Sequence, residues 1–172
     1  MNHDRYPDSY IHGILKAHTV FALVGASANS VRPSYFALKY LLAKGYRVIP
    51  VNPGLAGKEL AGQMVYASLR DIPEPVDVVD IFRNAAAALE ITRDAIAIGA
   101  KVVWMQLGVR NDEAARLAEE AGLKVVMNRC PKIEYGRLSG ELGWAGVHTR
   151  TLSSQKPVMG ARGFQNFRLG KS

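Results

Sequence analysis

A regular alternation of short apolar segments with helical patterns is the feature that most constrains the fold of this chain. Five segments are apolar, rich in β-forming residues and short enough to be buried strands: 19–25, 46–52, 76–82, 101–108 and 123–128. Helical patterns lie between several of them, at 34–45, 85–99 and 111–122, each with a glycine at its end. Strands that alternate with helices predict an α/β fold: a Rossmann-like, doubly wound, mainly parallel sheet in a single domain.

The two ends of the chain depart from this pattern. Residues 1–18 predict an N-terminal helical extension, with a short helix over 9–16, and the alternation occupies 19–138. From Pro131 onward no clear periodicity is present, which predicts an extended or loosely ordered tail, and 139–172 form a basic C-terminal extension. Residues 149–172 hold five Lys or Arg and no acid, and the whole chain has a net charge of +7. Such a tail is usually a solvated segment, and nucleic-acid binding, with Phe164 and Phe167 stacking on bases, is the alternative.

Composition narrows the class of protein. Hydrophobic residues make up 48% and charged residues 22% of the chain, as in an ordinary soluble domain. No apolar run approaches the roughly 20 residues that span a bilayer. The N-terminus has no signal-peptide pattern, so we expect a cytoplasmic protein without a membrane partner. Cys130 is the single cysteine, which excludes an internal disulfide.

The turn after the first predicted strand is the candidate ligand site. In open parallel sheets, ligands bind beyond the carboxyl ends of the strands. Gly25 allows a tight turn and a close approach of the backbone to a ligand, and small residues follow it at 26–30. The next helix, for which Ser34 is a plausible N-cap, offers unpaired N–H groups to an anion, and Arg32 adds a cation.

Two familiar nucleotide motifs are missing from this turn. The dinucleotide fingerprint G-x-G-x-x-G is reduced to Gly25, and the acid expected after the second strand is replaced by Asn52. A nicotinamide cofactor is therefore disfavoured, and the lack of a Walker sequence argues against nucleotide hydrolysis. Lys58 lies in "NPGLAGKEL", a loop that Gly54 and Gly57 should make mobile, where it could meet a second phosphate.

Four segments together point to a known family. They are "VFALVGASANSVRPSYFALKYLLAKGYRVIPVNP", "GKELAGQMVYASLRDIPEPVDVVDIFR", "WMQLGV" and "MNRCPKIEY". They resemble the small bacterial CoA-binding proteins, which are similar to the CoA-binding N-terminal domain of the succinyl-CoA synthetase α subunit. The resemblance covers roughly residues 15–138.

The resemblance implies coenzyme A as the cofactor and a set of contact residues. The glycine turn would contact the CoA phosphates through Gly25, Ala26, Ser27, Ser30 and Arg32. The adenosine side would be lined by Val51, Asn52 and Pro53, and Lys58 would contact CoA from its loop. The neighbouring strand ends would close the site with Phe82, Arg83, Met105, Gln106 and Leu107.

Departures from the synthetase bear on catalysis. The synthetase α subunit has a second domain with a phosphorylated histidine, and the histidines of this chain match no such motif. We therefore expect a non-catalytic carrier, sensor or regulatory module that binds CoA or an acyl-CoA, with no catalytic residue and no metal. A subunit of an acyl-CoA enzyme and a nucleic-acid-binding protein are the alternatives, and a homo-oligomer stays open. Cys130 is interpreted as a small buried residue, with a mixed disulfide to the CoA thiol as the alternative.

Overall fold

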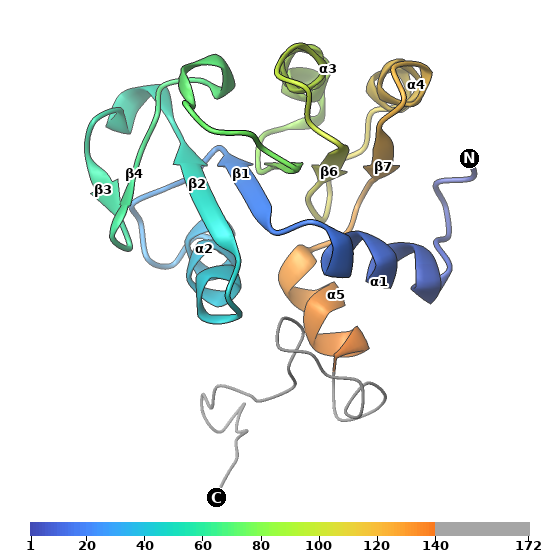
Figure 1. Cartoon of the computed structure of the whole chain (residues 1–172), viewed down its shortest axis with the longest axis horizontal. Helices are drawn as coiled ribbons and strands as arrows, with labels where there is room; N and C mark the ends of the chain where they lie inside the picture. The colour runs from blue at the N-terminus through green and yellow to red at the C-terminus, as the bar shows by residue number, and fades with distance from the viewer. Residues whose placement is uncertain (140–172) are drawn as a thin grey trace, which may run out of the picture.

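The central sheet contains five parallel strands in the order β2–β1–β5–β6–β7 (Figure 1). Their bounds are β1 (Val20–Val24), β2 (Arg47–Val51), β5 (Val78–Ile81), β6 (Val102–Met105) and β7 (Lys124–Val126). This computed structural model describes residues 1–139 of the chain. The predicted strands and the Rossmann-like single-domain fold are confirmed. The order reverses between β1 and β5, which is the point where doubly wound sheets bind ligands.

Helices cover both faces of the sheet, as Figure 1 shows. On one face lie α1 (Asp8–Ala17), α2 (Pro33–Ala43) and α5 (Pro131–Leu138), and on the other lie α3 (Ala85–Ala97) and α4 (Asp112–Glu120). Beyond β2 the chain forms a short antiparallel hairpin, β3 (Glu59–Leu60) and β4 (Gln63–Met64). Two 3₁₀ turns flank this hairpin, η1 (Pro53–Leu55) and η2 (Leu69–Asp71). No helix within residues 1–139 is both long and apolar enough to cross a membrane.

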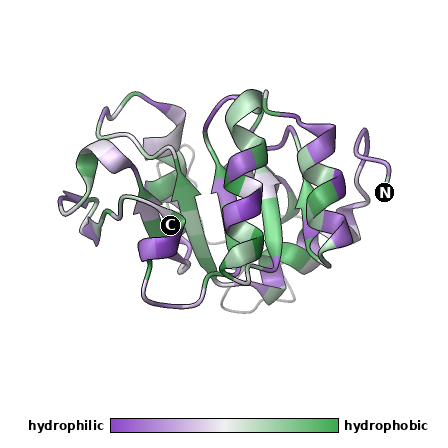
Figure 2. Ribbon diagram, turned by 90° about the horizontal axis from the view of Figure 1, so that it is seen from above, coloured by the Kyte–Doolittle hydropathy of each residue, from purple (hydrophilic) through white to green (hydrophobic). Residues whose placement is uncertain are grey.

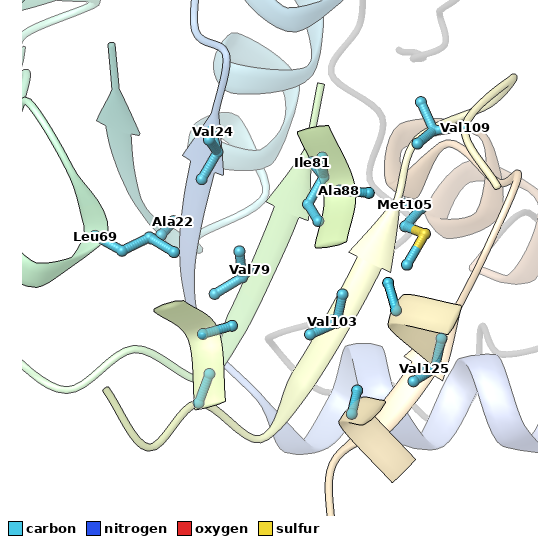
Figure 3. Close-up of a cluster of buried hydrophobic side chains, with 14 of the residues drawn as sticks. Ala22, Val24, Leu69, Val79, Ile81, Ala88, Val103, Met105, Val109 and Val125 are labelled. Carbon is cyan, nitrogen blue, oxygen red and sulfur yellow. The ribbon is translucent and has the colours of Figure 1, made fainter. Parts of the chain in front are cut away.

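Two hydrophobic cores follow from the alternation of side chains along each strand. Phe21, Leu23 and Trp104 point toward the α1/α2/α5 face, whereas Ala22, Val79 and Met105 point toward the α3/α4 face. Figure 3 shows the second cluster, in which small alanines of the helices allow close packing on valines of the sheet. Figure 2 looks onto α3 and α4 and shows hydrophilic residues on their outer sides above hydrophobic strands.

Two expectations about helices were wrong. Residues after Pro131 form the helix α5, because Pro131 takes the first helical position and Tyr135 buries its ring against Tyr40 and Tyr46. A helix of two turns is too short for its periodicity to be visible in the sequence. The N-cap of α2 is Arg32, and Ser34 lies inside the helix because Pro33 already starts it. The basic tail with Phe164 and Phe167 lies outside the described residues.

Candidate functional site

A cavity of about 1050 Å³ opens at the carboxyl ends of the strands, where the strand order reverses. Its walls come from the turn after β1, the start of α2, the ends of β2, β5 and β6, and the start of α5. Segments up to 109 residues apart in the sequence, from Val24 to Ile133, therefore meet at one place because parallel strands deliver all their carboxyl ends to one edge. This volume is at the upper end of the range of small-molecule and cofactor sites.

Gly25 fixes the shape of the turn after β1. Its φ angle of +95° is one that L side chains rarely adopt. A Cβ atom at this position would lie 2.5 Å from the carbonyl oxygen of Phe82 at the end of β5. Only glycine therefore lets the β1 turn approach the end of β5 as closely as it does. The Gly25 N–H donates to the Val51 carbonyl, which ties the same turn to β2.

Asn52 joins the loops that follow β1 and β2. Its side-chain amide donates to the Ala26 carbonyl at 2.7 Å, and its Oδ1 accepts from the Gly54 N–H at 2.7 Å. Dinucleotide-binding folds place at this position an acid that contacts ribose. In this chain the side chain is instead occupied by backbone groups, so it holds the cavity wall in shape.

Three cations line the cavity: Arg32, Arg83 and Lys132. Within residues 1–139, neither arginine has an ion-pair partner, and Lys132 lies 5.4 Å from the ring of Tyr40. The one lining acid in the described chain is Asp94, which is paired with Arg70 at 2.9 Å. The cavity therefore carries an excess of positive charge, which favours an anionic ligand.

The two helices that begin at the cavity, α2 and α5, differ from α3 and α4 in their N-caps. Asn84 and Asn111 cap α3 and α4 by accepting a backbone N–H at 2.9 Å. The N-caps of α2 and α5, Arg32 and Cys130, make no side-chain cap hydrogen bond. The partial positive charge of these two N-termini therefore adds to that of the lining cations.

Apolar side chains form much of the cavity rim. Four of the six large apolar residues exposed within 1–139 line the cavity: Val31, Phe36, Leu107 and Ile133. Exposed apolar side chains that gather around one opening indicate a surface that a ligand covers. Gln106 lies among them and is only 8% exposed, and its Oε1 has no hydrogen-bond partner in the described chain.

Most of the predicted contact residues meet at this cavity. Those that line it are Gly25, Ala26, Ser27, Arg32, Val51, Asn52, Pro53, Phe82, Arg83, Gln106 and Leu107. Three lie elsewhere. Ser30 is exposed on the turn, Lys58 is exposed between η1 and β3, and Met105 is completely buried in the α3/α4 core. The Lys58 loop, predicted to be mobile, is tied by backbone hydrogen bonds from Gly57 to Val65 and from Val65 to Lys58.

Sequence reasoning missed the contribution of α5 and of the β4–η2 segment. Lys132 and Ile133 enter the cavity from α5, and Ala67 and Ser68 enter it beside β2. Pro131 directly after a strand was the available signal for a helix that begins at the sheet edge. The second segment carries no such signal, because tertiary contacts bring it to the cavity, among them the parallel bridge between Val51 and Tyr66 and the ion pair between Arg70 and Asp94.

Asp80 is an unexpected feature beneath the site. It lies in the central strand β5, is 0% exposed, and neither carboxylate oxygen has a hydrogen-bond partner in the described chain. Burial raises the pKa of the Asp80 carboxyl well above its usual range. Folding therefore favours the protonated form, and this group lowers stability as the pH rises from about 4 toward its folded-state pKa. Asp77, three residues earlier, accepts the N–H groups of Thr19 and Val20 instead.

Within residues 1–139, no group of three or more His, Cys, Asp or Glu is placed to hold a metal ion. The groups at the cavity suit hydrogen bonding and charge pairing with an extended anion. Cys130 is the one thiol, and it lines the cavity beside Lys132 with 9% of its surface exposed.

Known proteins resemble this chain in sequence and in fold over most of its length. The uncharacterized protein YneT of Bacillus subtilis (strain 168) is 33% identical over 125 residues, which cover 73% of this chain and 91% of YneT. A hypothetical protein from Pyrococcus horikoshii OT3 is 44% identical, with a TM-score of 0.76 over 80% of this chain and 95% of the other.

A larger protein shares the same fold. The dinucleotide-forming acetyl-coenzyme A synthetase 1 of Ca. Korarchaeum cryptofilum, in its apo form, is 27% identical with a TM-score of 0.55. The match covers 63% of this chain and only 26% of the synthetase, so the two share one domain of that protein. The CoA binding domain family matches residues 19–136, which contain the whole sheet and the cavity, and the chain belongs to this family.

Proposed function

We propose that the chain binds coenzyme A or an acyl-CoA in the cavity, as a non-catalytic carrier, sensor or regulatory module. The observation that carries the proposal is the combination of charge and shape at one site. Arg32, Arg83 and Lys132 provide positive charge, and apolar side chains surround them. CoA needs both, because it joins phosphate groups to a long and largely apolar pantetheine arm.

The order of groups along the cavity matches the order of groups along CoA. Val51, Asn52 and Pro53 at the β2 end would line the adenosine, and the Gly25 turn with Arg32 would hold the diphosphate. The pantetheine arm would run past Phe82 toward Gln106 and Leu107. From β2 to β7 the sheet takes four steps of about 4.8 Å each, or roughly 19 Å in all. An extended ligand of the length of CoA fits this span.

Lys58 would contact the 3′-phosphate from outside the cavity. It follows η1, whose first residue Pro53 lines the adenosine end. The 3′-phosphate is attached to the ribose, at the adenosine end of CoA and away from the pantetheine arm. An exposed lysine on the neighbouring loop, with its backbone held by hydrogen bonds, suits this role.

Titration calorimetry with CoA tests the proposal. Arg32→Ala should weaken CoA binding by about 1.5–3 kcal/mol, roughly 10- to 150-fold, because a charge-assisted hydrogen bond is lost. Lys101→Ala is the matched control, since Lys101 is an exposed cation at the start of β6, on the opposite edge of the sheet. NAD, which lacks both the 3′-phosphate and the pantetheine arm, should bind more weakly than CoA. No heat with CoA, or equal losses for the two variants, would contradict the proposal.

A further inference from the structure

Cys130 sits at the far end of the cavity from the predicted adenosine side. It follows β7 and lines the cavity as the N-cap of α5. Hydrogen bonds to two consecutive backbone carbonyls fix its position. The Trp104 indole N–H donates to the Arg129 carbonyl at 2.9 Å, and the Glu134 N–H donates to the Cys130 carbonyl at 2.9 Å. The Cys130 backbone is therefore held at a defined place in the wall of a cavity large enough for a ligand.

Gln106 is independent evidence that a ligand occupies this end. Its side chain is about nine-tenths buried and lines the cavity, yet its Oε1 meets no donor within residues 1–139. Leaving a buried carbonyl oxygen without a donor destabilises the folded chain. An amide N–H of a bound ligand would supply the missing donor, and pantetheine contains such amides close to its thiol.

We propose that Cys130 exchanges disulfides with the sulfur of bound CoA, so that the cavity can hold CoA covalently. This inference rests on the proposed function, since it requires CoA to lie with its adenosine near β2. The sequence of contacts from Asn52 through Arg32 and Gln106 to Cys130 then follows that of adenosine, diphosphate, amide and thiol in CoA. The N-terminal end of α5 and Lys132 lie beside Cys130 in the cavity wall.

The exchange is balanced without a separate oxidant when CoA arrives as a disulfide. The Cys130 thiol gives its proton to solvent, and the thiolate attacks the sulfur of the bound CoA moiety. The Cys130–CoA disulfide forms as the original S–S bond breaks, and the departing thiolate takes up a proton. Attack by another thiol reverses the step and releases CoA. The arriving disulfide supplies the oxidising equivalent, and no net oxidation occurs.

Intact-protein mass spectrometry of the full chain tests the inference, with CoA disulfide as the probe and glutathione disulfide as the matched control. Cys130 is the only cysteine, so any adduct is assigned to it. We expect an adduct of one CoA moiety, reversed by dithiothreitol, that forms at least about tenfold faster than the glutathione adduct because binding raises the local concentration. Gln106→Met should slow the CoA reaction more than the glutathione reaction.

Cys130→Ser separates this inference from the proposed function. The variant should form no adduct but still bind reduced CoA in calorimetry. Reversible CoA binding together with equal rates for the two disulfides, or with no adduct, would overturn the exchange while leaving the proposed function in place. If the wild-type chain does not bind CoA reversibly, both the exchange and the proposed function are overturned.

Discussion

Replacing Gly25 by alanine tests whether the end of β1 must approach β5 as closely as the structure has it. The new Cβ would lie 2.5 Å from the Phe82 carbonyl oxygen and 2.9 Å from its carbonyl carbon. Both atoms belong to the backbone at a strand end, so no side-chain rotation relieves the contact. The φ angle of +95° adds a second cost for any residue with a Cβ.

Gly45→Ala is the matched control for the backbone angle. Gly45 has a φ angle of +96°, and a Cβ there would meet nothing within 4 Å. The left-handed conformation costs an alanine about 1–2 kcal/mol, and overpacking adds a further cost of roughly 1–3 kcal/mol. We therefore expect Gly45→Ala to lower the free energy of unfolding by about 1–2 kcal/mol and Gly25→Ala by about 2–5 kcal/mol. The larger loss is a substantial part of the 5–15 kcal/mol typical of a domain.

Urea denaturation followed by far-ultraviolet circular dichroism measures both free energies. Calorimetry with CoA adds a second readout, because moving Phe82 and the adjoining Arg83 changes the cavity. Gly25→Ala should weaken CoA binding, whereas Gly45→Ala, at the far end of α2, should not. Equal destabilisation by the two substitutions would refute the reasoning, since it would mean that the Phe82 carbonyl yields at no cost.

Two further substitutions probe the remaining charges. Lys58→Ala should weaken binding of CoA in calorimetry but leave dephospho-CoA unaffected, because only the 3′-phosphate reaches this loop. Equal losses for both ligands would exclude that contact. As the pH rises above about 4, the free energy of unfolding of Asp80→Asn should increase relative to that of the wild type by up to about 1.4 kcal/mol per pH unit. The reason is that burial raises the pKa of the Asp80 carboxyl, whereas asparagine has no proton to lose. Urea titrations at about pH 4.5, 6 and 7.5 measure this difference, and a difference that does not change with pH would contradict it.

The sequence by itself determined the fold and half of the cavity. Apolar segments of strand length that alternate with helical patterns leave few arrangements other than a parallel sheet with helices on both faces. Gly25 and Arg32 could be identified because a ligand turn after the first strand combines a local requirement for glycine with a known place in such a sheet. The N-caps Asn84 and Asn111 are equally local features, because each side chain accepts a backbone N–H three residues further along the chain.

Only the tertiary structure decided which distant side chains complete the cavity. Lys132 and Cys130 reach it because β7 is the last strand on the β5 side of the sheet, and strand order cannot be read from local patterns. Met105 and Gln106 are neighbours in the chain, yet one is buried in the α3/α4 core and the other lines the cavity, because successive residues of a strand face opposite sides. The tertiary structure also decided the burial of Asp80, because burial depends on what packs over the strand rather than on the strand itself. Neither carboxylate oxygen of Asp80 has a hydrogen-bond partner within residues 1–139.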